Sequence, residues 1–503
     1  MQAFSLRFNY LFRSTKGLAL VAIAMISLVT AIFGMLSGPM AEWGTRDLIV
    51  RLSGMSLVDA EREGRIIMLY HAISMAVVAI EVYFITAIVP MKDRERRSIN
   101  ATVTVGYLTA MIFGLGFAYF GRKFVFHGLF LFGQSMMFFG GILLASALWP
   151  WKKEYYVKDP DYAHTKKGVD LERVAFFAMA VATLGSAAFG AVAGSYWNNG
   201  FETFLAEDVV REPHKTSLQL AVIGHLHIML TLIGVAITLI IGKWYDFKGI
   251  FQKIAMPLMI AGTIVITLGA WAVVPFRSIA HTVIYVGSVP VLLAGLMLVI
   301  FGWNKLIRDR LAEQGIEKAT FGQKLKALIH DPLKFGSTWQ MVFMNFTVSG
   351  VGIFMAAKLD EIFRVWPARE ERIALTGHWH ILAGIIATII LFYYADLAGL
   401  KGKARQWFGW SVIIGSNIAF AAVTVLSVKR LFVSESGQQS LVNRTILLAD
   451  FGLVLVLIVL AMFMLWRLFD LFKRDGRWTT ELEIAGPDVT FEAKSAATEE
   501  VSL

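Results

Sequence analysis

The sequence predicts an all-α integral membrane protein, with twelve transmembrane helices in three pseudo-threefold four-helix arcs. Three observations lead to this prediction. Hydrophobic residues make up 57% of the 503 residues. Apolar runs of ~20 residues, the length that crosses a hydrocarbon core, recur from one end of the chain to the other. A histidine motif returns at a nearly constant interval, which indicates an internal repeat.

Twelve apolar runs can be placed along the chain, and most of the connections between them are short. The first run, residues 17–37, resembles a signal peptide, but we expect it to be retained because the twelve-span count needs it. The runs are centred near residues 28, 78, 110, 138, 182, 230, 264, 291, 348, 384, 418 and 456. Together they predict a single polytopic membrane domain over residues 1–470.

Each histidine motif lies near the beginning of an apolar run, in spans two, six and ten. The motifs contain His71, then His225 and His227, then His378 and His380. The first histidines of successive motifs are 154 and 153 residues apart. This spacing predicts three repeats.

We place the repeats at about 17–150, 171–303 and 339–470. Residues 304–338 have helical periodicity and are expected to form a cytoplasmic amphipathic linker, broken at Pro332. Residues 474–503 are acidic and polar, and we expect a disordered cytoplasmic tail.

The net charge of +10 could indicate a nucleic-acid partner, but the distribution of the charge argues against one. Lysine and arginine gather in the loops after spans two, four and eight, which is the positive-inside pattern. We therefore expect a multi-pass protein of the bacterial inner membrane, with both termini cytoplasmic and the histidine motifs near the outer face. The chain has no cysteine, which excludes disulfides, iron–sulfur clusters and thiolate metal sites within it.

Histidines inside membrane helices are rare and usually bind a cofactor or carry protons. Residues i and i+2 of an α-helix point about 200° apart, so the two histidines of a His-x-His motif cannot bind one ion together. Each can bind a different cofactor, and haem suits this pattern because it takes one imidazole from each of two helices. Gly224 and Gly377 precede two of the motifs and would admit either a flat ring or a neighbouring helix.

Histidines on spans two, six and ten, with His-x-His on span ten, resemble the catalytic subunit of haem-copper oxidases and nitric oxide reductases. The resemblance implies that His71 and His380 are the axial ligands of one haem b, and that His378 binds a second haem. It also implies that Lys429 and Arg430, at the end of span eleven, bind haem propionates.

The chain departs from this family where the family binds its second metal. Span seven contains no histidine, although the family has a His-His pair there, and Met229 replaces the cross-linked tyrosine of the oxidases. We therefore expect a divergent relative that lacks the copper site. Span six has gained His227, and the repeat symmetry suggests that His227 and His378 hold the second haem from both sides.

His225 would then face span two, where the repeat partner is Ile73. It would either form a hydrogen bond or bind a third haem. A shifted pairing, with His225 rather than His227 opposite His378, also fits the sequence. Two carboxylates within the spans, Glu81 deep in span two and Asp450 in span twelve nearer the outer face, are candidates for proton or quinol chemistry, with a structural role as the alternative.

These features predict a membrane cytochrome b subunit with two bis-histidine haems, or three if His225 binds one. It would transfer electrons between the quinone pool and a periplasmic c-type or multihaem cytochrome, without reducing oxygen. Other membrane or iron–sulfur subunits are expected partners. The alternatives are a terminal oxidase or nitric oxide reductase-like enzyme with an atypical active site, and a haem-free transporter or scaffold subunit.

Overall fold

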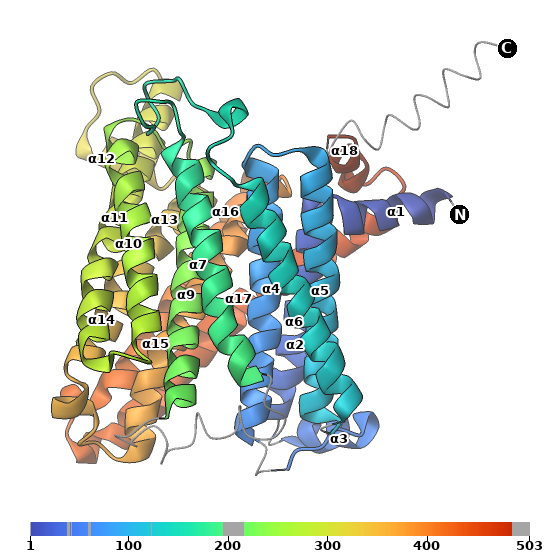
Figure 1. Cartoon of the computed structure of the whole chain (residues 1–503), viewed down its shortest axis with the longest axis vertical. Coiled ribbons are helices and arrows are strands. Elements are labelled where there is room, and N and C mark those ends of the chain that lie inside the picture. The colour runs from blue at the N-terminus through green and yellow to red at the C-terminus, as the bar shows by residue number, and fades with distance from the viewer. Residues whose placement is uncertain are drawn as a thin grey trace.

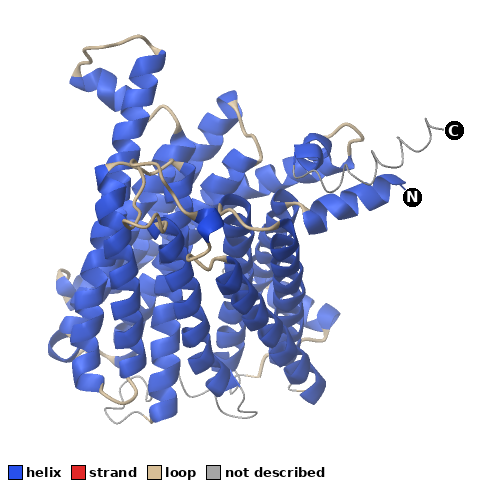
Figure 2. Cartoon of the chain, turned by 45° about the horizontal axis from the view of Figure 1, so that its top comes forward, coloured by secondary structure: helices blue, strands red, loops and turns tan. Residues whose placement is uncertain are grey.

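Long apolar helices run side by side through most of the molecule (Figure 1). The computed structural model describes residues 2–37, 41, 43–58, 62–121, 123–194 and 216–484, and in this part twelve helices are long and apolar enough to cross a membrane. All twelve centres predicted from the sequence fall within them. The prediction of an all-α membrane protein with twelve spans is therefore confirmed. The only extended pairing among the described residues is an isolated bridge between His164 and Asp170 (Figure 2).

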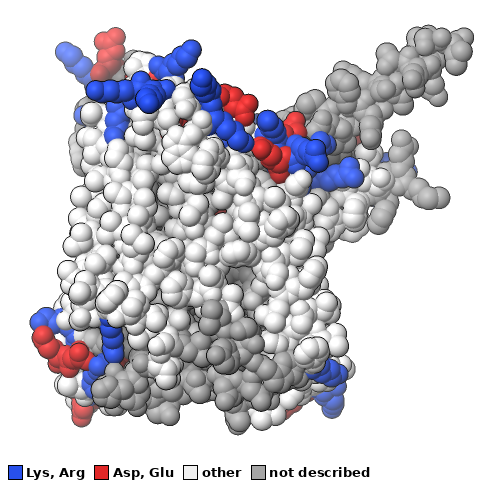
Figure 3. All heavy atoms as spheres, viewed as in Figure 1, with Lys and Arg blue, Asp and Glu red and all other residues white. Residues whose placement is uncertain are grey.

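The distribution of charge agrees with a membrane location. Lysine, arginine, aspartate and glutamate gather at the two ends of the molecule, and an almost uncharged band lies between them on the face shown in Figure 3. The chain is a multi-pass membrane protein. The spans are α2 (Thr15–Ser37), α4 (Arg62–Ile88), α5 (Asp93–Tyr119), α6 (Phe124–Ala147), α7 (Leu171–Gly194), α9 (Ser217–Trp244), α10 (Ile250–Ala272), α11 (Arg277–Glu313), α13 with η4 and α14 (Pro332–Val342, Phe343–Val348 and Ser349–Ala357), α15 (Ala368–Leu397), α16 (Gly402–Val428) and α17 (Glu435–Phe472).

Shorter helices lie at both ends of the bundle. On the end drawn at the top of Figure 1 are α1, α12 and α18, whereas α3 lies at the opposite end. Their bounds, with those of the remaining short elements, are α1 (Gln2–Arg13), α3 (Thr45–Ser53), η3 (Lys153–Tyr155), α12 (Phe321–Leu328), η5 (Leu359–Phe363), η6 (Lys429–Leu431) and α18 (Arg477–Ile484).

The pattern of helix contacts is the same in each group of four spans. In the first group α4 packs against α2 and α5, and α5 packs against α6. In the second group α9 packs against α7 and α10, and in the third α15 packs against α13 and α16. The second helices of the groups also meet, since α9 contacts both α4 and α15. This recurrence agrees with the predicted repeat, whereas the pseudo-threefold axis stays a prediction.

Hydrogen bonds link each group to the next at the end of the bundle that carries α12. In each case the end of the group's second helix is bonded to the first helix of the following group. For the third group, the following group is the first one. The bonds are Arg173 Nη1 to the carbonyl of Pro90 (2.8 Å), Tyr245 Oη to the carbonyl of Lys334 (2.6 Å), and Tyr394 Oη to the carbonyl of Lys16 (3.2 Å).

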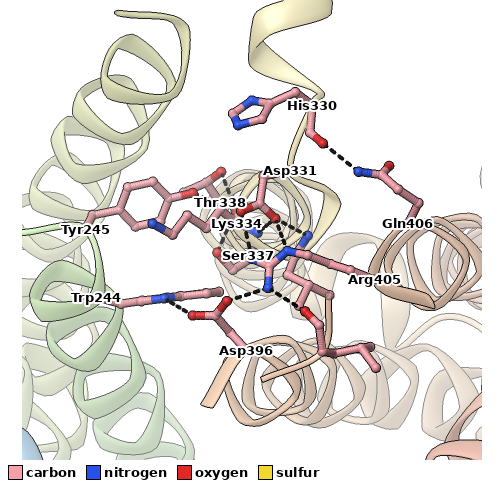
Figure 4. Close-up of polar contacts among 12 residues, drawn as sticks. Trp244, Tyr245, His330, Asp331, Lys334, Ser337, Thr338, Asp396, Arg405 and Gln406 are labelled. Atoms are coloured by element: carbon pink, nitrogen blue, oxygen red, sulfur yellow. Dashed lines mark hydrogen bonds and ion pairs between the residues drawn. The ribbon is translucent and has the colours of Figure 1, made fainter. Parts of the chain in front are cut away.

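A partly buried ionic cluster lies where α9, α13, α15 and α16 meet (Figure 4). Arg405 donates to both oxygens of Asp331 (3.0 and 2.7 Å) and to Asp396 (2.5 Å). The indole of Trp244 donates to the second oxygen of Asp396 (2.8 Å). Asp331 also caps α13 by accepting from its first backbone N–H groups. One guanidinium thus neutralises two carboxylates and joins three spans to the beginning of a fourth.

The predicted bounds of the linker, residues 304–338, are wrong at both ends. Helix α11 continues to Glu313, and span nine already begins at Pro332. Proline has no N–H to donate and its φ is preset for a helix, so at the first helical position it begins α13 instead of breaking a helix. The segment between the two spans contains only the short helix α12.

The predicted disordered tail at 474–503 is also wrong in part. Residues Arg477–Ile484 form α18, in which the side chain of Glu481 is buried. Arg467 of α17 donates to Glu481 (2.8 Å), and so does the hydroxyl of Tyr10 from α1 (2.6 Å). These bonds hold α18 against α1, the N-terminal helix, and against α17, the last span. Residues 485–503 lie outside the described part of the chain, as do residues 195–215 before α9.

We expect Arg405→Ala to lower the free energy of unfolding by about 3 kcal/mol, because it leaves Asp331 and Asp396 without their shared cation. Thermal unfolding in detergent measures the change. Arg308→Ala is the matched control, since the Arg308 side chain is 69% exposed and its ion pair is with Asp309 of its own helix. Equal stability of the two variants would contradict the role given to Arg405.

Candidate functional site

Five histidines lie on α4, α9 and α15, the three helices that contact one another in the middle of the bundle. All five lie in the third or fourth turn of helices that begin at the end of the bundle away from α12 (Figure 1). We call them the histidine cluster: His71, His225, His227, His378 and His380. The fold thus brings together side chains that are more than 300 residues apart in the sequence.

His71 and His225 form the most regular pair of the cluster. Their rings are parallel to within 9°, and their centroids are 6.2 Å apart across the contact between α4 and α9. The Nδ1 atom of His71 donates to the carbonyl of Ile67 (2.9 Å), one turn earlier in its own helix. The Nδ1 atom of His225 donates to the carbonyl of Ser186 on α7 (2.9 Å). Both rings are therefore held in orientation by the backbone.

The first histidines of the second and third motifs contact a glycine in the first span of their own group. A Cβ atom placed on Gly190 of α7 would lie 2.5 Å from Cε1 of His225. A Cβ atom placed on Gly352 of α14 would lie 3.3 Å from Cδ2 of His378. The ring of His225 therefore occupies space that only a glycine leaves open, and the ring of His378 packs closely against its glycine. This equivalence is a further sign of the internal repeat.

The second histidines of these motifs, His227 and His380, contact a helix of the next group. His227 contacts the indole of Trp379 on α15 (ring centroids 5.2 Å apart), and the same indole contacts His378 (5.6 Å). His227 and His378, which were expected to face each other across a haem, thus share Trp379 as a common neighbour. The ring of His378 also lines a small hollow between α14, α15 and α16, together with Met355 and Thr424.

His380 meets α4 at Tyr70. The hydroxyl of Tyr70 is hydrogen-bonded to Nε2 of His380, and the two rings pack edge to face (centroids 5.6 Å apart). The resemblance implied that His380 shares an iron with His71. The structure instead places the neighbouring residue of α4 on the nitrogen that would bind the metal, and it places His225 beside His71.

The glycines that precede two motifs serve helix packing. A Cβ atom on Gly224 would lie 2.9 Å from the carbonyl oxygen of Ala270 on α10, and one on Gly377 would collide with Ser427 on α16. Of the two uses left open by the sequence, the structure shows close approach of a neighbouring helix. In the first repeat the equivalent residue is Tyr70, and its side chain is too large for so close a contact with a neighbouring helix.

The basic pair at the end of α16 has acidic partners within the chain. Lys429 is 3% exposed and is paired with Glu370, which lies in the first turn of α15. Arg430 is paired with Glu435 at the beginning of α17 (3.1 Å). Both cations were expected at haem propionates. In this structure they connect the loop after α16 to α15 and α17.

The two carboxylates proposed from the sequence have different surroundings. Glu81 on α4 is 3% exposed, and its Oε1 atom has no hydrogen-bond partner among the described residues. Asp450 lies on the exposed surface of α17 and not inside the bundle. Only Glu81 is therefore placed where it could exchange protons with groups in the interior.

Sequence reasoning missed Tyr70, Trp379 and Gly190 as members of the site. Two of them adjoin the motifs: Tyr70 precedes His71, and Trp379 stands between His378 and His380. Their adjacency was the available signal, because polar or aromatic residues next to an intramembrane histidine share its environment. Gly190 lies 35 residues before His225 and left no local signal.

Comparison with protein-family models and with curated protein sequences gives no match to this chain. Its function is therefore inferred from the fold and from the histidine cluster.

We expect Gly190→Ala to displace the ring of His225 and to break its bond to Ser186, because the added methyl group has no room. Overpacking of this kind lowers stability by about 1–3 kcal/mol. Thermal unfolding of the purified protein measures the loss. Gly34→Ala on α2 is the control, since a Cβ atom there meets nothing within 4 Å. The assignment fails if both substitutions have the same effect.

Tyr70→Phe should lower the free energy of unfolding by about 1 kcal/mol, because it removes one hydrogen bond from His380. A double-mutant cycle with His380→Ala tests whether the loss belongs to this pair. We expect the two losses to be less than additive. Tyr156→Phe, which affects an exposed hydroxyl, is the control. Fully additive losses would show that Tyr70 and His380 do not act together.

Proposed function

We propose that this chain is a membrane cytochrome b subunit that binds haem on the histidine cluster and transfers electrons between quinones and a periplasmic redox partner. The observation that carries the proposal is the pair of His71 and His225. Two parallel imidazoles from different helices face a shared interface inside a membrane bundle, and intramembrane histidines usually serve a cofactor or proton transfer.

The orientation of the imidazoles supports metal binding through Nε2. In His71, His225 and His227 the Nδ1 atom is bonded to a backbone carbonyl at 2.9 Å. Metal-binding histidines in proteins are commonly held in this way, because a bond at one ring nitrogen fixes both the tautomer and the direction of the other nitrogen.

The distance between the rings of His71 and His225 also supports metal binding by this pair. Metal–nitrogen bonds to imidazole are about 2 Å long, so the centroids of two rings on opposite sides of one ion lie roughly 6 Å apart. The centroids of His71 and His225 are 6.2 Å apart. The separation of the two rings therefore agrees with that of a pair of axial ligands, which also requires the Nε2 atom of each ring to point at the iron.

The grouping of the side chains favours haem over a bare metal ion. Among the described residues, no three histidine, aspartate or glutamate side chains come together to hold an ion. Two imidazoles alone are too few ligands for a protein-bound metal, but haem brings four nitrogens of its own. A cluster that offers histidines in pairs therefore suits a porphyrin.

The exposed residues beside His380 also suit the binding of a flat ring such as a porphyrin. His380, Ala383 and Ala387 share one face of α15 and are exposed, although α15 is the most buried of the twelve spans. Tyr70 and Ser74 of α4 are exposed as well. A strip lined by small side chains thus adjoins a histidine in the middle of the bundle.

Two features of the proposed haem sites differ from what the resemblance implies. His71 is paired with His225 and not with His380, and Lys429 and Arg430 have carboxylate partners. The kinship to haem-copper oxidases and nitric oxide reductases, and the count of two haems, therefore stay predictions. The axial pair that the geometry favours is His71 with His225, and His380 and the group around Trp379 are candidates for a second site.

Haem would supply reversible one-electron chemistry at its iron. The residues of the chain would orient the ligands, and the apolar helices would keep water from the site. Glu81 follows His71 by ten residues on α4, a rise of about 15 Å, and we assign to this buried carboxyl group the uptake of a proton from a quinol. With the basic loops and the termini on the cytoplasmic side of an inner membrane, the cluster lies in the outer half, within reach of a periplasmic cytochrome.

The proposal is tested by absorption spectra of the purified chain in its oxidised, reduced, and reduced plus carbon monoxide states, with haem and copper measured per chain. Low-spin haem without a carbon monoxide shift supports a closed electron-transfer subunit. A wild-type haem that binds carbon monoxide would favour the oxidase-like or reductase-like enzyme. A folded protein without haem would overturn the proposal and leave the transporter or scaffold function.

His225→Ala identifies the ligand pair. We expect it to convert one low-spin haem into a form that binds carbon monoxide, because the iron loses one of its two axial nitrogens. His380→Ala would have this effect instead if the pairing is His71 with His380. His164→Ala, in an exposed loop, should leave the spectrum unchanged. Thermal unfolding of each variant separates loss of a ligand from loss of the fold.

A further inference from the structure

Helix α17 is the least buried of the twelve spans. Only 11% of the residues in its apolar window are buried, whereas the other spans range from 28% to 61%. Its large exposed side chains extend along most of its length and include Leu447, Phe451, Val454 and Leu457. A span that contacts so little of its own chain offers a broad apolar surface to lipid or to another membrane protein.

The contact between α17 and α16 is extensive and fixes the depth of α17 in the membrane. Gly452 of α17 packs against Gly415 of α16, and a Cβ atom on either glycine would collide with the other's carbonyl oxygen. Gly415 lies near the middle of a membrane span that runs from Gly402 to Leu431. Gly452 is therefore near the midplane of the membrane.

Asp450 precedes Gly452 by two residues and so lies near the same depth, not near the outer face as the sequence suggested. Its side chain is exposed on the surface of α17. Leu447 and Val454 flank it along this surface, one turn before and one turn after. No hydrogen bond or ion pair connects it to another described residue. A carboxylate at this depth is costly in lipid, and intramembrane carboxylates almost always face a protein partner.

We propose that the exposed face of α17 around Asp450 is the docking surface for a transmembrane helix of a partner subunit, which presents a lysine or arginine near the membrane midplane. The charge of Asp450 specifies the chemistry of the occupant, and the apolar side chains around it provide the packing. This inference does not depend on haem binding.

A second copy of the chain is a poorer occupant than a different protein. A two-fold dimer through this face would use the same patch on both copies and would bring two Asp450 carboxylates toward each other. Like charges in a medium of low dielectric constant repel strongly. A basic side chain from a different helix removes this repulsion and satisfies the carboxylate.

The proposal can be tested with the full chain in phosphatidylcholine vesicles and with synthetic transmembrane peptides. The chain has no cysteine, so Glu154→Cys provides a single site for a dye, and energy transfer reports association with a labelled peptide. One leucine-rich peptide carries a central lysine, a second a central leucine and a third a central glutamate. We expect the lysine peptide to bind about tenfold more tightly than the leucine peptide, as for a hydrogen-bonded pair of membrane helices.

Asp450→Leu should abolish this preference, and Asp450→Asn should reduce it. Val454→Trp should weaken binding by obstructing the surface, whereas Leu268→Trp on the exposed face of α10 should not. Thermal unfolding confirms that each variant is folded. The proposal is overturned if the lysine and leucine peptides bind the wild-type chain equally, if Asp450→Leu keeps the preference, or if the glutamate peptide binds best.

Discussion

Polar side chains inside this bundle can find hydrogen-bond partners only within the protein, because the hydrocarbon core of a membrane offers none. The rest of the structure is arranged around this constraint. Arg405 is surrounded by two carboxylates and a carbonyl, and Arg467 by Glu481 and Tyr10. In the histidine cluster the backbone carbonyls take one ring nitrogen of His71, His225 and His227. These three rings are thus held in orientation by one nitrogen, and under the proposed function the other nitrogen is left for a ligand.

Much of the fold could be predicted from the sequence, because membrane spans depend on local composition. A run of apolar residues long enough to cross lipid has few alternatives to a helix, and all twelve such runs proved to be helices. The errors lie where two local signals compete or where a partner is distant. Pro332 can end one helix or begin another, and here it begins α13. The polar composition after Arg477 suggested disorder, yet Trp478 and Glu481 are buried against α1 and α17.

The histidine cluster was predictable as a set but not in its pairing. Positions 71, 225, 227, 378 and 380 fall at nearly equal intervals in the sequence, and this spacing predicted that they lie near one depth. Which rings meet depends on how each helix is rotated and on the residues beside it. Strict symmetry would place His225 against Ile73, but the side chain of His71 reaches it instead. Tyr70 stands where the other motifs have glycine, and it extends to His380.

The contact between α1 and α18 bears on how the chain is made. Tyr10 and Glu481 are separated by 471 residues, so all twelve spans are synthesised before these two side chains can meet. At a synthesis rate of about 5–20 residues per second, Tyr10 waits roughly 25 to 90 seconds for its partner. During this interval α1 can pack only against the helices made before α18, among them α2 and α5. The bond between Tyr10 and Glu481 therefore forms only after the last span has been made, and a chain that stops before Glu481 lacks this link between its first helix and α18.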